Sequence, residues 1–290
     1  MNPGFSPSPM KPKLAVESWP EGMIEIVDVS GPAAVPTLSM AHDRQYVEDV
    51  IGAKRNNGHY NCDAKVTSAC RWNVQSMVDA AAGVMGMPSG QRVACSPSSG
   101  FHHAHHAEGG AFCTFNGLIV AAISHIRQYE RKVLIIDCDW HWGDGTAQII
   151  DCLKLCNWID HVSHCGGMPV SSSIDDDDDD FEDDWPLDKE VLAWVQNTAH
   201  IIDGSKYGLI LYQAGADMYV HDPLGGCLSI PQLKKRDEII FEAAQSQDVP
   251  LVWNFAGGYK KDKNGKISEV LDIHRNTLDI CHEIYFHLDD

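Results

Sequence analysis

The sequence predicts an α/β fold, with a central parallel sheet and helices on both faces of that sheet. Apolar runs of strand length alternate along the chain with segments whose apolar residues have helical spacing. Such alternation is typical of parallel strands joined by helical crossovers. The apolar runs are also continuous, as expected for strands that are buried on both faces.

The size and composition of the chain are those of a globular protein. It has 290 residues, of which 44% are hydrophobic and 22% charged, and no linker or repeat divides it. We therefore expect a single domain over residues 1–290. The chain has no apolar run near the ~20 residues of a membrane helix, no signal core at its start and no CxxC pair. These features favour a cytoplasmic protein that does not bind membranes.

The charge of the chain is strongly acidic, at −19. This excludes a nucleic-acid-binding footprint, which is basic, and leaves open a cationic substrate or partner. Nine acids lie in the ten residues 175–184, so about half of the charge belongs to one segment. We expect an acidic loop over residues 171–185, which is either solvated or draws cationic substrates to the site entrance.

The predicted elements follow in order. Residues 1–20 are rich in proline and are expected to form an extended arm. Apolar runs predict strands over 92–95, 133–136, 208–211 and 249–253, and apolar spacing predicts helices over 46–51, 73–87, 115–128, 192–202 and 232–245, with another helix near the end of the chain. Polar residues follow each run. Because ligands bind beyond the carboxyl ends of parallel strands, these residues are the first candidates for a functional site.

The strongest candidates follow the second apolar run. Asp137, Asp139 and His141 occupy positions i, i+2 and i+4, and alternate side chains of a strand face the same side. Two carboxylates and an imidazole suit a divalent cation, and Asp217, after the third run, can supply a further ligand. A catalytic zinc takes three protein ligands and keeps one position open. The alternative for each aspartate is a helix cap.

Two further clusters follow the first and the last run. His102 and His103 could carry protons near neutral pH, but His105 and His106 come close behind, and a His-rich surface tract is an equal alternative. Residues 257–259 are Gly-Gly-Tyr. Paired glycines let the backbone approach a ligand closely, and a tyrosine there could donate its phenolic proton to a developing oxyanion.

Four segments taken together are far more specific. They are Gly100–Ala104, Asp137–Gly145, Gly215–Gly226 and Gly257–Tyr259. In this order they resemble the motifs of the zinc-dependent histone deacetylase superfamily, which includes acetylpolyamine amidohydrolases and acetoin-utilisation proteins. The stretch 224–259 is most similar to class IV-like bacterial members. The resemblance runs from about His42 to the end of the chain and implies a three-layer arginase/deacetylase-like fold.

The resemblance also implies a role for each matching residue. The zinc ligands would be Asp139, His141 and Asp217. His103 would act as the general base toward water and then as the general acid toward the leaving amine, with His102 as its tandem partner.

Three other residues would support this chemistry. Asp137 and Asp144 would hydrogen-bond His102 and His103, respectively, and fix their tautomers. Tyr259 would stabilise the tetrahedral intermediate. Asp137 also matches a structural K⁺ or Na⁺ site of the family.

The substrate-binding residues are less well matched. Phe112 corresponds to one wall of the acyl-lysine channel, and Asn61 and Gly258 are further candidates for substrate binding. The second channel phenylalanine of the family has no clear counterpart around residues 164–168.

These assignments imply a zinc-dependent amidohydrolase that removes an acetyl or other acyl group from an amine such as acyl-lysine. One alternative is a deacetylase of acetylpolyamines or other small amides, and another is a non-catalytic binder of acyl-amines. An arginase-like enzyme, with two manganese ions, is disfavoured by the His102–His103 pair and Tyr259. The expected partners are an acylated lysine peptide, an acetylpolyamine or a small amide, and the sequence leaves open a homo-oligomer.

Overall fold

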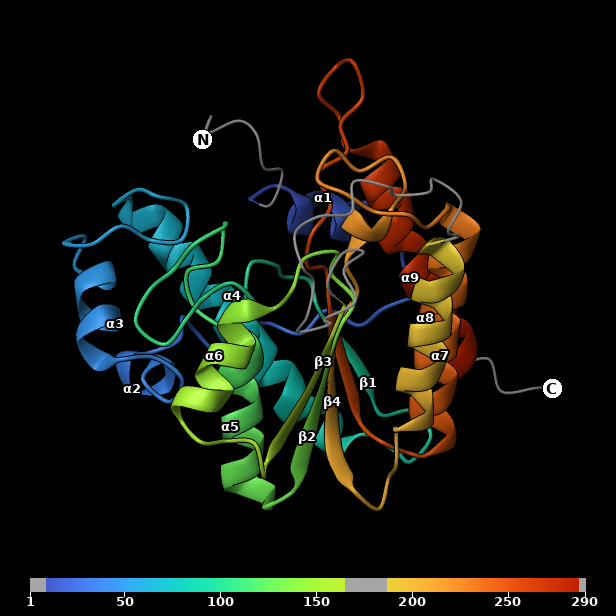
Figure 1. Cartoon of the computed structure of the whole chain (residues 1–290), viewed down its shortest axis with the longest axis horizontal. Helices are drawn as coiled ribbons and strands as arrows, with labels where there is room; N and C mark the ends of the chain where they lie inside the picture. The colour runs from blue at the N-terminus through green and yellow to red at the C-terminus, as the bar shows by residue number, and fades with distance from the viewer. Residues whose placement is uncertain (1–8, 165–186, 287–290) are drawn as a thin grey trace, which may run out of the picture.

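A computed structural model of the chain describes residues 9–164 and 187–286, and its strands form a five-stranded parallel sheet (Figure 1). The strands are β1 (Val93–Ser96), β2 (Lys132–Asp137), β3 (Ile159–Ser163), β4 (Tyr207–Gln213) and β5 (Leu251–Asn254), in the order β1-β5-β4-β2-β3. The predicted parallel α/β architecture is therefore confirmed. The acidic loop expected over 171–185 lies outside the described residues.

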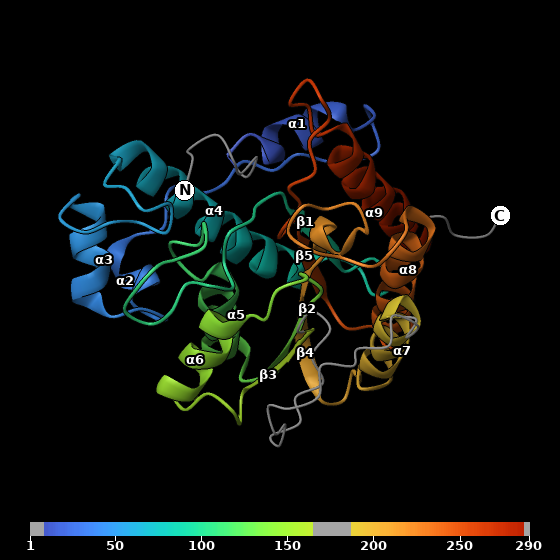
Figure 2. The ribbon, with the colours of Figure 1, turned by 45° about the horizontal axis from the view of Figure 1, so that its top comes forward.

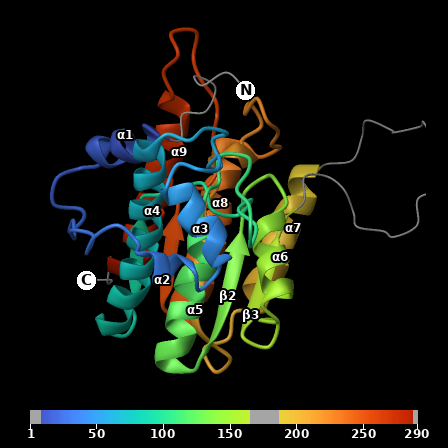
Figure 3. The ribbon, with the colours of Figure 1, turned by 90° about the vertical axis from the view of Figure 1, so that its left-hand side faces the viewer.

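Helices cover both faces of the sheet. One face carries α2 (Val35–Leu38), α3 (Arg44–Ile51), α4 (Ala64–Gly83), α5 (Gly117–Tyr129) and α6 (Asp144–Cys152), and the other carries α1 (Lys11–Ser18), α7 (Leu187–His200), α8 (Ile230–Ser246) and α9 (Ser268–Phe286). Figure 3 looks onto the first of these faces. No helix of the described residues is long and apolar enough to cross a membrane.

Alternate residues of the central strands pack into different cores. In β2, Val133 and Ile135 belong to the hydrophobic cluster that includes side chains of α3 to α6, whereas Leu134 and Ile136 belong to the cluster of α1, α7, α8 and α9. β4 is buried along its whole length. Because both faces of these strands are covered by helices, both sets of alternate residues are apolar, which explains the continuous apolar runs of the sequence.

The amino-terminal segment differs from the prediction. Residues 11–18 form helix α1 rather than part of an extended arm, and α1 packs against α9. Pro12 lies in the first turn of α1, where a proline is tolerated because the N–H groups of that turn have no partner within the helix. Lys11 and Ala15 are buried, so the tertiary contacts of α1 override the expectation from proline content.

The strand ends determine where function can lie. All strand pairs in the sheet are parallel, so the loops that follow β1, β2, β4 and β5 all lie at the carboxyl ends of the strands. This end of the sheet is uppermost in Figure 1 and comes forward in Figure 2. Each polar cluster noted in the sequence lies in one of these loops.

Candidate active site

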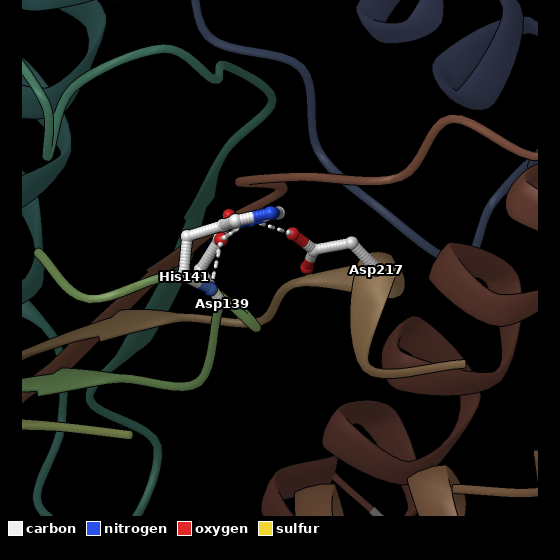
Figure 4. Close-up of side chains that lie close together, drawn as sticks. All are labelled: Asp139, His141 and Asp217. Atoms are coloured by element: carbon white, nitrogen blue, oxygen red, sulfur yellow. Dashed lines mark hydrogen bonds and ion pairs between the residues drawn. The ribbon is translucent and has the colours of Figure 1, made fainter. Parts of the chain in front are cut away.

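Asp139, His141 and Asp217 converge beyond the carboxyl ends of β2 and β4 (Figure 4). One donor atom of each side chain lies within 4.8 Å of the others. The Nδ1 atom of His141 lies 3.1 Å from Asp139 Oδ1 and 3.2 Å from Asp217 Oδ2. Both aspartates are buried, and His141 is partly exposed. The structure thus brings the three predicted metal ligands together.

Local hydrogen bonds, rather than strand geometry, orient the ligands after β2. The strand ends at Asp137, so Asp139 and His141 are not strand residues, and strand alternation does not explain how they are oriented. Instead, Asp137 Oδ1 accepts from the backbone N–H of Asp139 at 3.1 Å, and Asp139 Oδ1 accepts from that of His141 at 3.0 Å. Each hydrogen bond forms an Asx turn, in which an aspartate side chain fixes the backbone two residues further on. Asp217 lies in the short 3₁₀ helix η2 (Ala216–Met218) after β4.

The electrostatics of this cluster favour a bound cation. Burial and the nearby charge of Asp139 raise the pKa of Asp217 to about 8, and hydrogen bonds to the two carboxylates raise the pKa of His141 to about 10. Asp217 Oδ1 is buried and has no hydrogen-bond partner among the described residues. Two buried carboxylates and an imidazole form a donor set that fits Zn²⁺, which is the metal that the motif resemblance implies.

The tandem histidines lie beside the metal cluster. His102 Nδ1 lies 2.8 Å from Asp137 Oδ2, and His103 Nδ1 lies 2.5 Å from Asp144 Oδ1. The two expected carboxylate–imidazole pairs are therefore present. The centroids of the two imidazole rings are 4.0 Å apart. Burial opposes protonation of His102, but the charges of Asp137 and Asp139 outweigh it and raise the pKa of His102 to about 9.

His105 and His106, which the residues alone left as an alternative, take different places. His105 Nε2 lies 3.0 Å from Asp144 Oδ2, so His105 shares the carboxylate of His103. His106 Nδ1 lies 2.8 Å from the carbonyl oxygen of Ala41, outside this network. A pocket beside the metal cluster is lined by His102 and His103 and by neither of the other two histidines.

Tyr259 and Phe112 lie near the metal cluster, in the lining of one pocket. Both line the same pocket as His102, His103 and Asp139, and the centroids of their rings are 6.1 Å apart. Burial and the surrounding carboxylates raise the pKa of the Tyr259 phenol well above its usual value. Tyr259 therefore remains a protonated phenol, which can act as a hydrogen-bond donor at neutral pH.

Gly257, rather than Gly258, is the glycine that approaches the metal cluster. A Cβ atom on Gly257 would lie 2.1 Å from Asp217 Oδ2, and the Gly257 N–H donates to Asp139 Oδ2 at 2.8 Å. Gly258 has φ +133°, and a Cβ atom there would lie 2.9 Å from Ala216 Cβ. Gly258 is buried and is not among the pocket-lining residues, so its role in substrate binding stays a prediction.

The structure also places Asn61 outside the pocket. Its side-chain Oδ1 accepts from Asn57 Nδ2 at 2.8 Å and from the backbone N–H of Asp63 at 2.9 Å. The side chain thus makes hydrogen bonds within its own loop, and Asn61 is not among the pocket-lining residues. The sequence alone could not reveal this use of the amide.

Sequence reasoning missed two residues that support the site. Gln213, the last residue of β4, donates from Nε2 to Asp137 Oδ1 at 2.7 Å and also lines the pocket. Its signal was a polar residue at the end of an apolar run. Lys11 of α1 donates from Nζ to the carbonyl oxygens of Ala256 and Gly257, at 2.5 and 2.9 Å. Its position about 245 residues away in sequence leaves no local signal.

Comparisons with known proteins agree with this arrangement. A model of the histone deacetylase domain matches residues 14–158, a range that holds both histidines of the tandem pair and two of the three metal ligands. An uncharacterized protein of Picosynechococcus sp. is 27% identical over 194 residues, which is 65% of this chain and 63% of that protein. Probable histone deacetylase 19 of Zea mays is 27% identical over 186 residues, which is 59% of this chain and 34% of that protein.

A third relative, histone deacetylase 2 of Arabidopsis thaliana, is 24% identical over 195 residues, which is 60% of this chain and 46% of that protein. The chain thus spans less than two thirds of the length of each of these relatives. The resemblance to class IV-like members stays a prediction. Because the domain model matches half of the chain and its motif residues meet at one site, the chain belongs to the histone deacetylase family.

Proposed function

We propose that the protein is a Zn²⁺-dependent amidohydrolase that removes an acetyl or other acyl group from an amine such as acyl-lysine. The observation that carries this proposal is one pocket lined by Asp139 of the three-donor metal cluster, by the carboxylate-bound His103 and by the partly buried Tyr259. When bound by Asp139, His141 and Asp217, zinc supplies Lewis acidity that polarises an amide carbonyl and acidifies a water molecule.

His103 is the residue best placed to move protons. Its Nδ1 atom is engaged by Asp144, which leaves Nε2 free to accept a proton from the attacking water. The same atom then returns the proton to the leaving amine, so the products are a carboxylate and a free amine. Asp144 holds the tautomer that this step requires.

Tyr259 supports the developing oxyanion. Its phenol is kept protonated by burial and by the surrounding negative charge, so it can donate a hydrogen bond to the amide oxygen as charge builds there. The ring of Phe112 lies near two other rings, with centroid separations of 6.1 Å to Tyr259 and 5.9 Å to His59. These rings suit the apolar methylene stem of an acyl-lysine side chain.

Metal content and a substrate panel test this proposal. The protein, purified with zinc, should hold one zinc ion per chain and hydrolyse acyl-lysine peptides, with acetylpolyamines and small amides assayed in parallel to define the substrate class. The His141→Ala variant should lose both metal and activity. If the protein holds zinc and hydrolyses no member of the panel, the proposal fails and a non-catalytic acyl-amine binder is favoured.

Several expectations stay predictions beside this proposal. They are the structural K⁺ or Na⁺ near Asp137, a single domain over the whole chain, the cytoplasmic location and the oligomeric state. At the expected K⁺ or Na⁺ site, both carboxylate oxygens of Asp137 already accept hydrogen bonds, from His102, Gln213 and the Asp139 N–H.

A further inference from the structure

Asp144 is held by two imidazoles rather than one. His103 Nδ1 lies 2.5 Å from Asp144 Oδ1, and His105 Nε2 lies 3.0 Å from Asp144 Oδ2. The two rings therefore engage different oxygens of one carboxylate. Together they outweigh the effect of burial and hold the pKa of Asp144 well below its usual value, so the shared group remains an anion that accepts from both sides.

A second donor matters because Asp144 is half exposed. The relative exposure of its side chain is 47%, against 20% for His103. Asp144 is the first residue of α6, where a negative charge is favoured by the helix dipole, but the dipole does not fix the rotation of the carboxylate. With only His103 as a partner, the carboxylate could turn toward solvent and lose its short bond to the catalytic imidazole.

His105 itself is anchored by its surroundings. Its backbone N–H donates to the carbonyl oxygen of Glu108 at 2.9 Å, and its own carbonyl oxygen lies 2.9 Å from His42 Nδ1. The other ring nitrogen, Nδ1, lies 3.5 Å from Glu108 Oε1. The His105 ring thus lies between the carboxylates of Asp144 and Glu108. Both the N–H and the carbonyl oxygen of the His105 backbone are also hydrogen-bonded.

We propose that His105 is a positioning residue for His103. By donating from Nε2 to Asp144 Oδ2, it holds the carboxylate plane so that Oδ1 receives the Nδ1–H of His103 and His103 Nε2 stays directed at the pocket. The inference rests on the proposed amidohydrolase function and adds a third histidine to its proton-transfer machinery, one that touches neither substrate nor metal.

Three variants test this role. His105→Ala removes the second donor, whereas His105→Gln keeps a side-chain N–H that can reach Asp144. His106→Ala is the matched control, because His106 bonds the Ala41 carbonyl oxygen and not Asp144. We expect His105→Ala to lower kcat by about 10-fold with little change in KM, His105→Gln to recover most of kcat, and His106→Ala to behave like the unaltered protein. Zinc content should be equal in all of them.

Proton NMR supplies a readout that does not depend on activity. The Nδ1–H of His103 in its short bond to Asp144 should give a low-field resonance, identified by its absence in Asp144→Asn. We expect this resonance to broaden or vanish in His105→Ala and to persist in His105→Gln and His106→Ala. Circular dichroism would verify that each variant is folded.

The outcomes separate the two proposals. A folded His105→Ala protein that keeps both kcat and the low-field resonance overturns the positioning role, as does a loss that His105→Gln fails to restore. If the unaltered protein hydrolyses nothing, the proposed function fails, while the resonance still reports whether His105 positions His103.

Discussion

The loop after β2 and the loop after β5 both reach the metal cluster, but they are held in place differently. The first is organised by its own residues, because Asp137 and Asp139 each accept the backbone N–H of the residue two positions on. The second is held from a distance. Gly257 donates to Asp139, Tyr259 donates its backbone N–H to Asp222, and Lys11 donates to two carbonyl oxygens. One loop has hydrogen bonds among its own residues beside the metal cluster, whereas the other is held there by residues of other elements.

The closest approach of the loop after β5 to a metal ligand, which lies after β4, gives the largest expected effect. In Gly257→Ala, the new Cβ atom would collide with Asp217 Oδ2, 2.1 Å away, and displace a metal ligand. We expect the variant to lose stoichiometric zinc, measured by elemental analysis, and with it all hydrolysis. Gly83→Ala is the control, because nothing lies within 4 Å of the added atom there. Full zinc content in Gly257→Ala would show that the loop after β5 can shift, contrary to the comparison.

Tyr259→Phe removes only the phenolic oxygen from the same loop. We expect kcat on an acyl-lysine peptide to fall by about 10²–10³-fold, as for other oxyanion donors, while zinc content stays at the level of the unaltered protein. Steady-state kinetics and metal analysis together check this. Unchanged kcat would remove Tyr259 from the proposed chemistry.

Lys11→Met tests whether the distant anchor matters for catalysis. Methionine keeps the buried volume of the side chain but removes the donor to Ala256 and Gly257, so the loop that carries Tyr259 should lose its alignment. We expect kcat to fall by about 10- to 100-fold, since small misplacements have effects of this size. Lys13→Met, on the exposed side of the same helix, should leave kcat unchanged. Equal kinetics for the two variants would contradict the distinction between the loops.

The smallest expected effect is on stability and concerns His42, which contacts the loop after β1. It bonds the His105 carbonyl oxygen and accepts from the Asn116 N–H, and burial lowers its pKa to about 4. As the pH falls, His42 is protonated in the unfolded chain, where its pKa is near 6.5, before it is protonated in the folded protein. Stability is therefore lost as pH falls from about 6.5 to about 4. Urea unfolding at several pH values should show a shallower loss for His42→Asn, and parallel curves would exclude this contribution.

The same distinction explains how much the sequence could predict. Asp139 and His141 could be paired from the sequence, because they lie two residues apart and hydrogen bonds between them keep their side chains close. Lys11 carried no signal, because a buried lysine in a proline-containing segment looks like an exposed one until α9 covers it. Substrate binding by Asn61 stays a prediction, and the sequence did not show that its amide is used by the turn in which it lies.

The fold was predictable where burial is continuous. β2 and β4 were found because each is flanked by helices on both faces, so each reads as an unbroken apolar run. β3 was not among the predicted strands, since it lies at an edge and holds Asp160, which pairs with Lys132 and Lys206. The helix α6 was also missed, because its first residue, Asp144, was interpreted through the motif rather than through helical spacing.

The contact between α1 and α9 has a consequence for biosynthesis. During synthesis α9 emerges long after α1, so α1 cannot pack against α9 until then. Lys11 can therefore reach the loop after β5 only when both helices are available. The candidate active site of the nascent chain therefore stays incomplete until the loop after β5 has been synthesised.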